Sequence, residues 1–277
     1  MLGSRNGEPS GQGGAAMNIL ICIGSYRRNG NTAHIAAMIE EELARRAADA
    51  GVPLAVEIIF LAHEQIGLCR GCRVCFDKGE TLCPLHDDFL AIKAKMVEAD
   101  GLLVASPIYV NDVSGTTKNW IDRLAHVCHR PQFAGKCAYL VTTIGSGQSS
   151  HALRTLGAAL QTWGFHIVGQ TGFKTGALMD KAELRARFQA ETARIAGRLF
   201  DAIQQRRFAN PSFLSLMTFH IQQSVWQQQP SDTVDYRYWE SQGWLAPERE
   251  FYIAHHANRV KVILARLTGS LLKPFVA

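Results

Sequence analysis

The sequence has no uninterrupted apolar run of about 18 residues, the length that a membrane-spanning helix requires, so no membrane span is expected. It also has no cluster of basic residues. The formal net charge is only +5 over 277 residues, and lysines and arginines are scattered. This distribution predicts solvated basic side chains and no nucleic-acid partner. With 47% apolar and 19% charged residues, the composition is that of a globular protein with a substantial core.

The first sixteen residues lack the apolar core of a signal peptide and are rich in glycine. We expect residues 1–16 to form a disordered leader, with Met17 a candidate for the physiological start. Without export, the seven cysteines would lie in a reducing cytosol. That compartment favours metal binding or redox chemistry over structural disulfides, and the expected localisation is cytoplasmic.

Two common nucleotide-binding motifs are missing from the loop at residues 24–32, which reads G-S-Y-R-R-N-G-N-T. It contains neither the G-K-[ST] of a P-loop nor G-x-G-x-x-G. The loop nevertheless offers many donors to an anion, since it opens a helix whose N–H groups are free. We therefore predict a site for a non-transferred phosphate monoester, with a plain polar N-cap turn as the alternative. The donor side chains are Ser25, Arg27, Arg28, Asn31 and Thr32.

Strands and helices alternate from Met17 onward. The alternation predicts an α/β fold with a doubly wound five-stranded parallel sheet, which binds ligands beyond the carboxyl ends of its strands. Loops 24–32, 106–115 and 142–150 follow three of these strands. The expected strands are 18–24, 54–61, 101–105, 136–143 and 166–169, and the expected helices are 32–50, 115–126, 149–163 and about 180–208.

Residues 209–277 extend beyond this domain, which we place at residues 17–208. We expect a mainly helical extension that ends in a helix from about Glu248 to Leu272. It is too short for a core of its own and is predicted to pack across the parent domain or a second subunit, which makes a homo-oligomer the expected state. Its aromatic residues include Trp226, Tyr236, Tyr238, Trp239 and Trp244.

Four of the seven cysteines lie in the loop at residues 66–88: Cys69, Cys72, Cys75 and Cys83. Their C-x2-C-x2-C beginning and the proline after the last cysteine also occur in bacterial ferredoxins. The gap of seven residues before Cys83 is long for that pattern. Three interpretations remain open: a [4Fe–4S] cluster, thiols without metal, and a four-thiolate zinc site. The other cysteines, Cys22, Cys128 and Cys137, lie in or beside apolar runs and are predicted to be core residues.

Three motifs in this order resemble the flavodoxin-like NAD(P)H-dependent FMN reductases and, among them, the iron–sulfur flavoproteins. Residues 24–32 match the family's FMN-phosphate loop. Residues 106–123, S-P-I-Y-V-N-D-V-S-G-T-T-K-N-W-I-D-R, match the segment along the isoalloxazine ring, and residues 68–88 match the cysteine loop. The resemblance covers roughly residues 17–175.

The resemblance implies a set of FMN-binding residues. The phosphate would be held by Ser25, Arg27, Asn31 and Thr32. The ring would be bordered by Pro107, Ile108, Tyr109 and Asn111 on one flank, and by Thr143, Ile144 and Gly145 on the other. Asp87 and Asp88 are interpreted as a helix cap and not as catalytic acids. No catalytic side chain is named, because a flavin performs the bond chemistry itself.

The expected function is therefore FMN-dependent NAD(P)H oxidoreductase. Electrons would pass from the nicotinamide through FMN to a quinone, a flavin or another small acceptor, directly or through a [4Fe–4S] cluster at the four cysteines of the loop. One alternative is a non-enzymatic electron carrier or redox sensor with the same cofactors. Another keeps the fold without the flavin, as a thiol- or zinc-based interaction protein.

Overall fold

The computed structural model describes residues 16–176, 179–206 and 208–272. The expected leader lies outside these residues, except for Ala16. In the described part, no helix combines the length and the apolar character needed to cross a membrane.

A parallel sheet forms the centre of the molecule, with the strand order β2-β1-β3-β5-β6. The doubly wound five-stranded sheet predicted from the sequence is confirmed. A short additional strand, β4 (Asp112–Val113), pairs antiparallel with the end of β3. The five parallel strands are β1 (Met17–Ile23), β2 (Leu54–Phe60), β3 (Gly101–Tyr109), β5 (Cys137–Ile144) and β6 (His166–Lys174).

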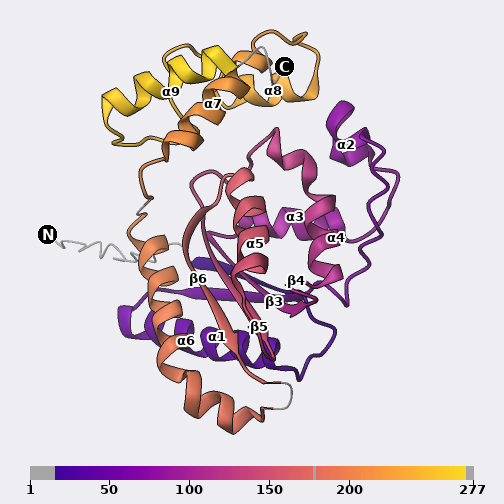
Figure 1. The fold of residues 1–277 in the computed structure, drawn as a ribbon, viewed down its shortest axis with the longest axis vertical. Helices are drawn as coiled ribbons and strands as arrows, with labels where there is room; N and C mark the ends of the chain where they lie inside the picture. The colour runs from indigo at the N-terminus through magenta and orange to yellow at the C-terminus, as the bar shows by residue number, and fades with distance from the viewer. Residues whose placement is uncertain (1–15, 177–178, 207, 273–277) are drawn as a thin grey trace, which may run out of the picture.

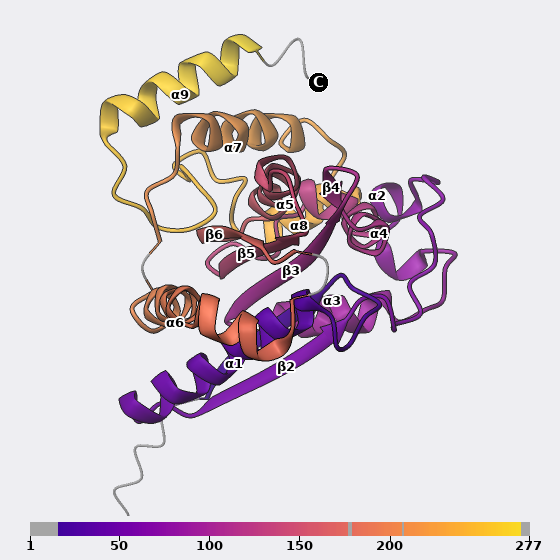
Figure 2. The ribbon, with the colours of Figure 1, turned by 60° about the horizontal axis from the view of Figure 1, so that its bottom comes forward.

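Helices cover both faces of the sheet (Figures 1 and 2). Successive residues of a strand point to opposite faces, so Ile19 and Ile21 of β1 lie in one core cluster and Leu20 and Cys22 in the other. Side chains of α1 and α6 complete the first cluster, and those of α3, α4 and α5 the second. The bounds are α1 (Asn31–Ala50), α3 (Phe89–Glu98), α4 (Gly115–Arg123), α5 (Ser150–Thr162) and α6 (Lys181–Gln204).

Strand β6 is longer than predicted. The sequence indicated its end at Gly169, whereas it runs to Lys174, paired with β5 over its whole length. Its second half, Q-T-G-F-K, is polar because β6 is an edge strand, and a polar segment gives little strand signal. A further loop, beginning at Thr175, therefore reaches the carboxyl edge of the sheet.

The C-terminal extension is helical, as expected, with α7 (Phe213–Trp226), α8 (Val234–Ser241) and α9 (Arg259–Leu272). The predicted start of the last helix at Glu248 is wrong, because the helix begins at Arg259. Residues before it are irregular since Tyr252 packs into an aromatic cluster, where its carbonyl oxygen accepts a hydrogen bond of 3.2 Å from Trp244 Nε1.

The extension lies at the amino edge of the sheet, beside the segment that leads into β5 (Figure 1). Trp239 Nε1 donates to the carbonyl oxygen of His129 at 2.7 Å, and Ala134 joins the aromatic cluster of the extension. These aromatic residues therefore lie away from the expected flavin site, which is at the carboxyl edge.

Candidate functional site

The loop between β1 and α1 gathers hydroxyl, guanidinium and backbone N–H donors at the start of a helix. Ser25 and Thr32 are 4% and 3% exposed, and Arg27 lies at the surface. Gly30 is the N-cap residue of α1 and supplies no side-chain cap. The first N–H groups of a helix have no partner within the helix, so this turn offers them to an anion together with the positive end of the helix dipole.

Residues far apart in the sequence hold this loop in place. Thr32 Oγ1 and Thr143 Oγ1, at the end of β5, share a hydrogen bond of 2.6 Å. Asn31 Nδ2 donates to Thr175 Oγ1 at 2.9 Å. Loops after β1, β5 and β6 thus converge on one point. Thr175 was missed by the sequence reasoning because β6 was predicted to end at Gly169.

A buried hydroxyl cluster under Gly24 was also missed. Ser114 Oγ donates to the carbonyl oxygen of Gly24 at 2.6 Å, and Thr117 Oγ1 donates to Ser106 Oγ at 3.1 Å. A Cβ added at Gly24 would lie 1.8 Å from Thr117 Oγ1, so only glycine fits here. Ser114 is the N-cap residue of α4 and accepts from Thr117 N, and this N-cap pattern could have revealed the cluster.

The loop after β3 is a tight hairpin at the rim of the same edge. Tyr109 pairs with Asp112 across a two-residue turn, in which Val110 has φ 49° and Asn111 has φ 68°. Two positive φ angles are typical of a type I′ turn, and the left-handed region is strained for a β-branched residue by on the order of 1–3 kcal/mol. Val110 is 98% exposed, so no contact within the chain explains the strain.

The residues predicted to border the flavin ring differ in exposure. Pro107 and Ile108 are buried in β3, and Ile108 packs in the core. Tyr109 is 58% exposed and Asn111 lies at the surface. On the other flank, Thr143 and Ile144 are buried and Gly145 is exposed, so the rim available to a planar ring is formed by Tyr109, Asn111 and Gly145.

The four cysteines of the loop line one cavity of about 110 Å³, with Arg123 and Phe89 among the other lining residues. Cys69 and Cys72 are exposed, whereas Cys75 and Cys83 are half-buried. Within the ranges described, no three Cys, His, Asp or Glu side chains are placed to hold a metal ion. The four thiols thus share a cavity without converging on one point in this structure.

Helix α4 connects the cysteine loop to the carboxyl edge of the sheet, where FMN is expected. We call this part, with the residues around Gly24 and Thr32, the flavin edge. The first turn of α4 carries the hydroxyls under Gly24, and its later turns hold the loop. Asn119 Oδ1 accepts from Cys69 N at 3.1 Å, and Arg123 forms a buried ion pair with Asp87. Asp87 Oδ1 also accepts from Phe89 N at 3.2 Å at the start of α3, whereas Asp88, the N-cap residue, makes no side-chain cap, so the predicted capping role applies to Asp87 alone. Arg123 and backbone donors hold the pKa of Asp87 below its usual value, although burial opposes them.

Burial raises the pKa of all three cysteines outside the loop: Cys22 to about 12, and Cys128 and Cys137 to about 11. These thiols remain protonated at neutral pH. Cys22 and Cys137 are buried, as predicted for core residues, whereas Cys128 is half-buried. Within the loop, burial raises the pKa of Cys75, and the charges of Cys69 and Cys83 raise it further.

With this geometry described, comparison with known proteins decides the family. The model of the NADPH-dependent FMN reductases matches residues 17–177, more than half of the chain. The chain belongs to this family. It is an FMN-dependent oxidoreductase, and residues 178–277 lie beyond the matched part.

Curated relatives include iron–sulfur flavoproteins of archaea. One from Archaeoglobus fulgidus is 26% identical over 191 residues, covering 69% of this chain and 82% of that protein. One from Methanocaldococcus jannaschii is 36% identical over 107 residues, covering 39% of this chain and only 51% of that protein. An NADPH:quinone oxidoreductase of Arabidopsis thaliana is 31% identical over 137 residues, 47% of this chain and 61% of that protein.

Solved structures share the fold. A flavone reductase superposes with a TM-score of 0.53 at 17% identity, covering 70% of this chain and 66% of that one. An oxidoreductase from Corynebacterium diphtheriae superposes with a TM-score of 0.50 at 22% identity, covering 69% of this chain and 99% of that one. At these identities the likeness concerns the fold alone.

Proposed function

We propose that the protein oxidises NAD(P)H with FMN bound at the carboxyl edge of the sheet, and passes the electrons to a quinone, a flavin or another small acceptor. The observation that carries the proposal is the donor group around Thr32, which is built before any ligand is present. The flavin supplies the redox chemistry when bound. The protein binds and orients it, and the exposed rim at Tyr109 leaves room for a nicotinamide.

The donor set suits a phosphate monoester. Ser25, Thr32 and the N–H groups of the first turn of α1 can donate to it, while Asn31 Nδ2 donates to Thr175 Oγ1 and to the carbonyl oxygen of Gly176 and so holds the loop. No carboxylate takes part in the hydrogen bonds of this loop among the described residues. Arg28 stacks over the ring of Phe60, 4.9 Å from its centroid, so Arg27 is the better placed arginine for the phosphate.

The phosphate loop is tested by FMN titration. Asn31→Ala and Thr32→Ala should each weaken FMN binding by about 1–3 kcal/mol. Thr32→Ala removes a hydrogen bond to a charged oxygen, and Asn31→Ala releases the loop from Thr175 and Gly176. Thr233→Ala, which removes an N-cap hydroxyl of α8 far from the loop, is the matched control and should leave FMN affinity unchanged. Unchanged affinity in both loop variants would remove the loop from the site.

A redox assay distinguishes an enzyme from a non-enzymatic electron carrier. Wild-type protein with FMN should bleach rapidly when NADH or NADPH is added without oxygen, and should turn over when a quinone is supplied. Slow bleaching with both nucleotides would contradict the enzyme and favour the carrier.

We also propose that Cys69, Cys72, Cys75 and Cys83 hold a [4Fe–4S] cluster. Their number and their shared cavity support this, and a cluster would supply one-electron chemistry next to the flavin domain. About four irons per chain are expected in protein purified without oxygen. Replacing one of these cysteines by serine should lose iron and retain FMN. Protein with FMN but without iron, even after reconstitution, would exclude the cluster.

Finally, we propose a homo-oligomer formed through α9, the outermost helix in Figure 2. Val262, Ala265 and Gly269 are buried toward α7, whereas an apolar seam is left 50–74% exposed: Val260, Leu264, Leu267 and Leu271. These four residues are spaced by four, three and four positions, the spacing of a coiled-coil seam. Such a seam is complementary to itself, so a second copy related by a two-fold axis fits it.

Light scattering tests whether the apolar seam of α9 forms the oligomer interface. The double variant Leu264→Glu/Leu267→Glu should be monomeric, because four negative charges would meet in the paired interface. Val97→Glu, at an exposed apolar position of α3, is the control. A monomeric wild type, or an oligomer that survives the double substitution, would contradict self-association through α9. Binding of the wild-type monomer to lipid vesicles would instead assign the seam to a membrane surface.

A further inference from the structure

The cysteine loop has almost no core of its own. Its two short helices, α2 (Val74–Asp77) and η1 (Glu80–Leu82), contain no buried residue. Leu68 is 79% exposed and Leu82 is 60% exposed. The position of the loop must therefore come from polar contacts, because apolar burial contributes little there.

These contacts include two separate anchors. The first is at α4, where Asn119 and Arg123 hold the ends of the loop near Cys69 and Asp87. The second is Arg130, in the segment between α4 and β5. Arg130 is 2% exposed, and its Nη2 donates to the carbonyl oxygen of Cys75 at 2.6 Å and to Glu80 Oε2 at 3.3 Å.

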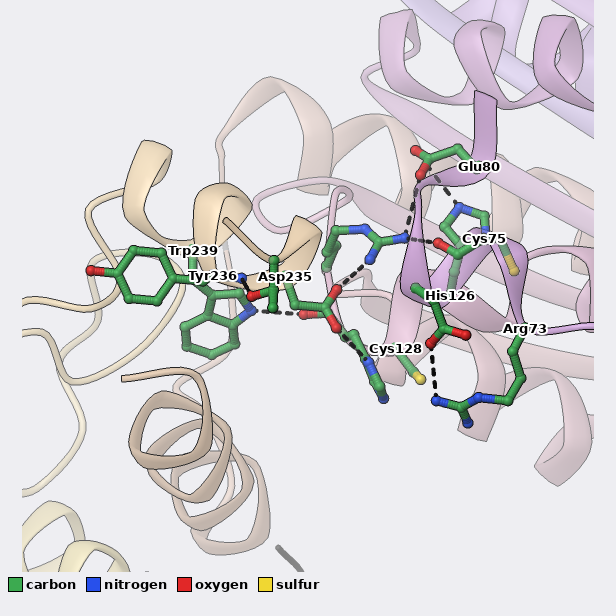
Figure 3. Close-up of polar contacts among 12 residues, drawn as sticks. Arg73, Cys75, Glu80, His126, Cys128, Asp235, Tyr236 and Trp239 are labelled. Carbon is green, nitrogen blue, oxygen red and sulfur yellow. Dashed lines mark hydrogen bonds and ion pairs between the residues drawn. The ribbon is translucent and has the colours of Figure 1, made fainter. Parts of the chain in front are cut away.

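Arg130 takes its other partner from the extension. Its Nη1 donates to Oδ1 of Asp235, a residue of α8 that is 7% exposed. Figure 3 shows Asp235 between Trp239 on one side and the segment of Cys75 and Glu80 on the other. The carboxylate of Asp235, more than 150 residues away from Cys75 in sequence, thus orients the Arg130 guanidinium that holds the cysteine loop.

Asp235 is held from both sides of the contact between the domain and the extension. Its Oδ2 lies 2.9 Å from Nδ1 of His129, a residue of the domain. The fully buried Trp239, one turn further along α8, donates to the carbonyl oxygen of His129 and packs against Phe219 and Trp244 of the extension. The carboxylate is therefore preorganised by His129 and by the aromatic cluster that fixes α8.

The charges at this junction balance only when Asp235 is present. Lys93 is 6% exposed and pairs with Glu80, which Arg130 also contacts. His126 stays neutral because burial, followed by repulsion from Lys93, lowers its pKa to about 3. Two buried cations thus meet two carboxylates. Without Asp235, Glu80 alone would serve both cations, and a buried charge without a partner is costly.

We propose that Asp235 is a positioning residue for the cysteine loop, acting through Arg130, and that this is a role of the C-terminal extension. The proposal concerns the placement of Cys75 and goes beyond the proposed function, since it holds whether the loop binds a cluster or only thiols. The extension then acts on the loop of the redox site from the edge opposite to the predicted flavin site.

The experiment measures thiol alkylation in the full-length, reduced and metal-free protein. Iodoacetamide is the probe, and labelled peptides are quantified by mass spectrometry over time. In Asp235→Asn, which keeps the size of the side chain, Cys75 should react at least about tenfold faster than in the wild type, because labelling follows the population of the open loop. Cys22 and Cys137 should remain protected. Amide hydrogen exchange over residues 72–83 should accelerate in the same variant.

Three further variants sharpen the result. Asp235→Glu retains the charge and should restore most of the protection. Asp232→Asn, at an exposed acid of the same extension, should behave as the wild type. Arg130→Lys keeps a cation but cannot bridge the carbonyl oxygen and both carboxylates, so it should expose Cys75 as well.

Two results would overturn the proposal. One is unchanged labelling of Cys75 in both Asp235→Asn and Arg130→Lys. The other is simultaneous labelling of Cys22 and Cys137, which would show that the residue only stabilises the whole fold. FMN affinity should be unchanged in all four variants, so a failure of wild-type protein to bind FMN would concern the proposed function and not this inference.

Discussion

The flavin edge and the junction between the cysteine loop and the extension are held together by different kinds of interaction. At the flavin edge, neutral hydroxyls hold the loops, as in the hydrogen bond of 2.6 Å between Thr32 and Thr143. At the junction, buried ions do so: Arg130 and Lys93 against Glu80 and Asp235. The first region unites segments of one domain at the carboxyl ends of β1, β5 and β6. The second joins the domain to its extension.

The difference follows from what each region must do. A site for a phosphate dianion needs free donors and no competing carboxylate, and hydroxyls can fix its shape without adding charge. A loop with no apolar core needs strong and directional anchors, and a buried guanidinium gives several at once. The flavin edge should therefore depend on shape, and the junction on charge balance and pH.

The largest effect is expected from Arg130→Met. The substitution keeps much of the volume and removes a buried cation from two carboxylates. We expect a loss of about 3–5 kcal/mol in the free energy of unfolding, measured by urea denaturation, because Asp235 would remain buried without its partner. Arg45→Met removes an exposed arginine that pairs with Glu42 and Asp49, and should cost less than about 1 kcal/mol. Equal losses in both variants would show that the junction is no stronger than a surface pair.

A smaller effect, confined to the flavin edge, is expected from Gly24→Ala. The added methyl group would meet Thr117 Oγ1 at 1.8 Å, and the hydroxyl cluster would have to move. Overpacking costs about 1–3 kcal/mol, which should appear mainly as weaker FMN binding in a fluorescence titration. Gly157→Ala, where the new Cβ meets only Leu140 at 3.7 Å, is the control. FMN affinity equal to that of the wild type in Gly24→Ala would separate the hydroxyl cluster from flavin binding.

The pH dependence of stability tests the charge balance. His126 has its pKa lowered to about 3, first by burial and then by Lys93, and that of Glu80 is lowered to about 2. Glu80 is held there by Lys93 although burial opposes it. A lowered pKa means that the unfolded chain binds the proton first, so stability is complete above the unfolded pKa and declines as pH falls. His126 should act from about pH 6.5 downward and Glu80 from about pH 4.5, because these are their usual pKa values.

Between these two values His126 can be separated from Glu80, and a variant of His126 separates it from His34, His166 and His255, whose pKa values burial also lowers. The free energy of unfolding should fall by up to about 1.4 kcal/mol per pH unit for this one group. His126→Gln should flatten the slope by that amount, whereas His151→Gln, at a side chain 58% exposed, should not. Parallel slopes in wild type and His126→Gln would mean that the junction does not exclude the proton.

The features that could be predicted from the sequence are those that a short local pattern encodes. The buried strand of Ile19 and Ile21, the helical spacing of Ile35 and Ile39, and the donors of the phosphate loop each carry their own signal. Cysteines close in sequence could also be assigned to one loop, although not to the geometry of their sulfurs. The parallel sheet and the edge that holds the site follow from these patterns.

The missing parts depend on partners distant in sequence. Thr175 could not be assigned to the site from the sequence, because only the pairing with β5 shows that β6 extends to Lys174. Ser106 and Thr117 look like ordinary hydroxyl residues until the fold places them under Gly24. Arg130 and Asp235 are 105 positions apart, and nothing in either neighbourhood indicates that they meet. Tertiary contacts of this kind leave no periodic pattern in the sequence from which they could be predicted.

The smallest effect tests whether the hydroxyls at the flavin edge act on shape alone. Thr32→Val and Thr143→Val each remove one hydroxyl of the pair that shares the 2.6 Å hydrogen bond, with little change in volume. Each should cost about 0.5–1.5 kcal/mol of stability without FMN, because one buried hydroxyl loses its partner. In FMN titrations the two should differ. Thr32→Val loses a donor to the phosphate as well, whereas Thr143→Val loses only the support of Thr32.

A double-mutant cycle makes this difference quantitative. The double variant should be less unstable than the sum of the single variants, since neither partner remains to be left unpaired. If Thr32 donates to the phosphate, Thr143→Val should weaken FMN binding clearly less than Thr32→Val does. Equal losses of affinity would mean that the two hydroxyls only shape the loop, and that the backbone N–H groups at the start of α1 carry the phosphate.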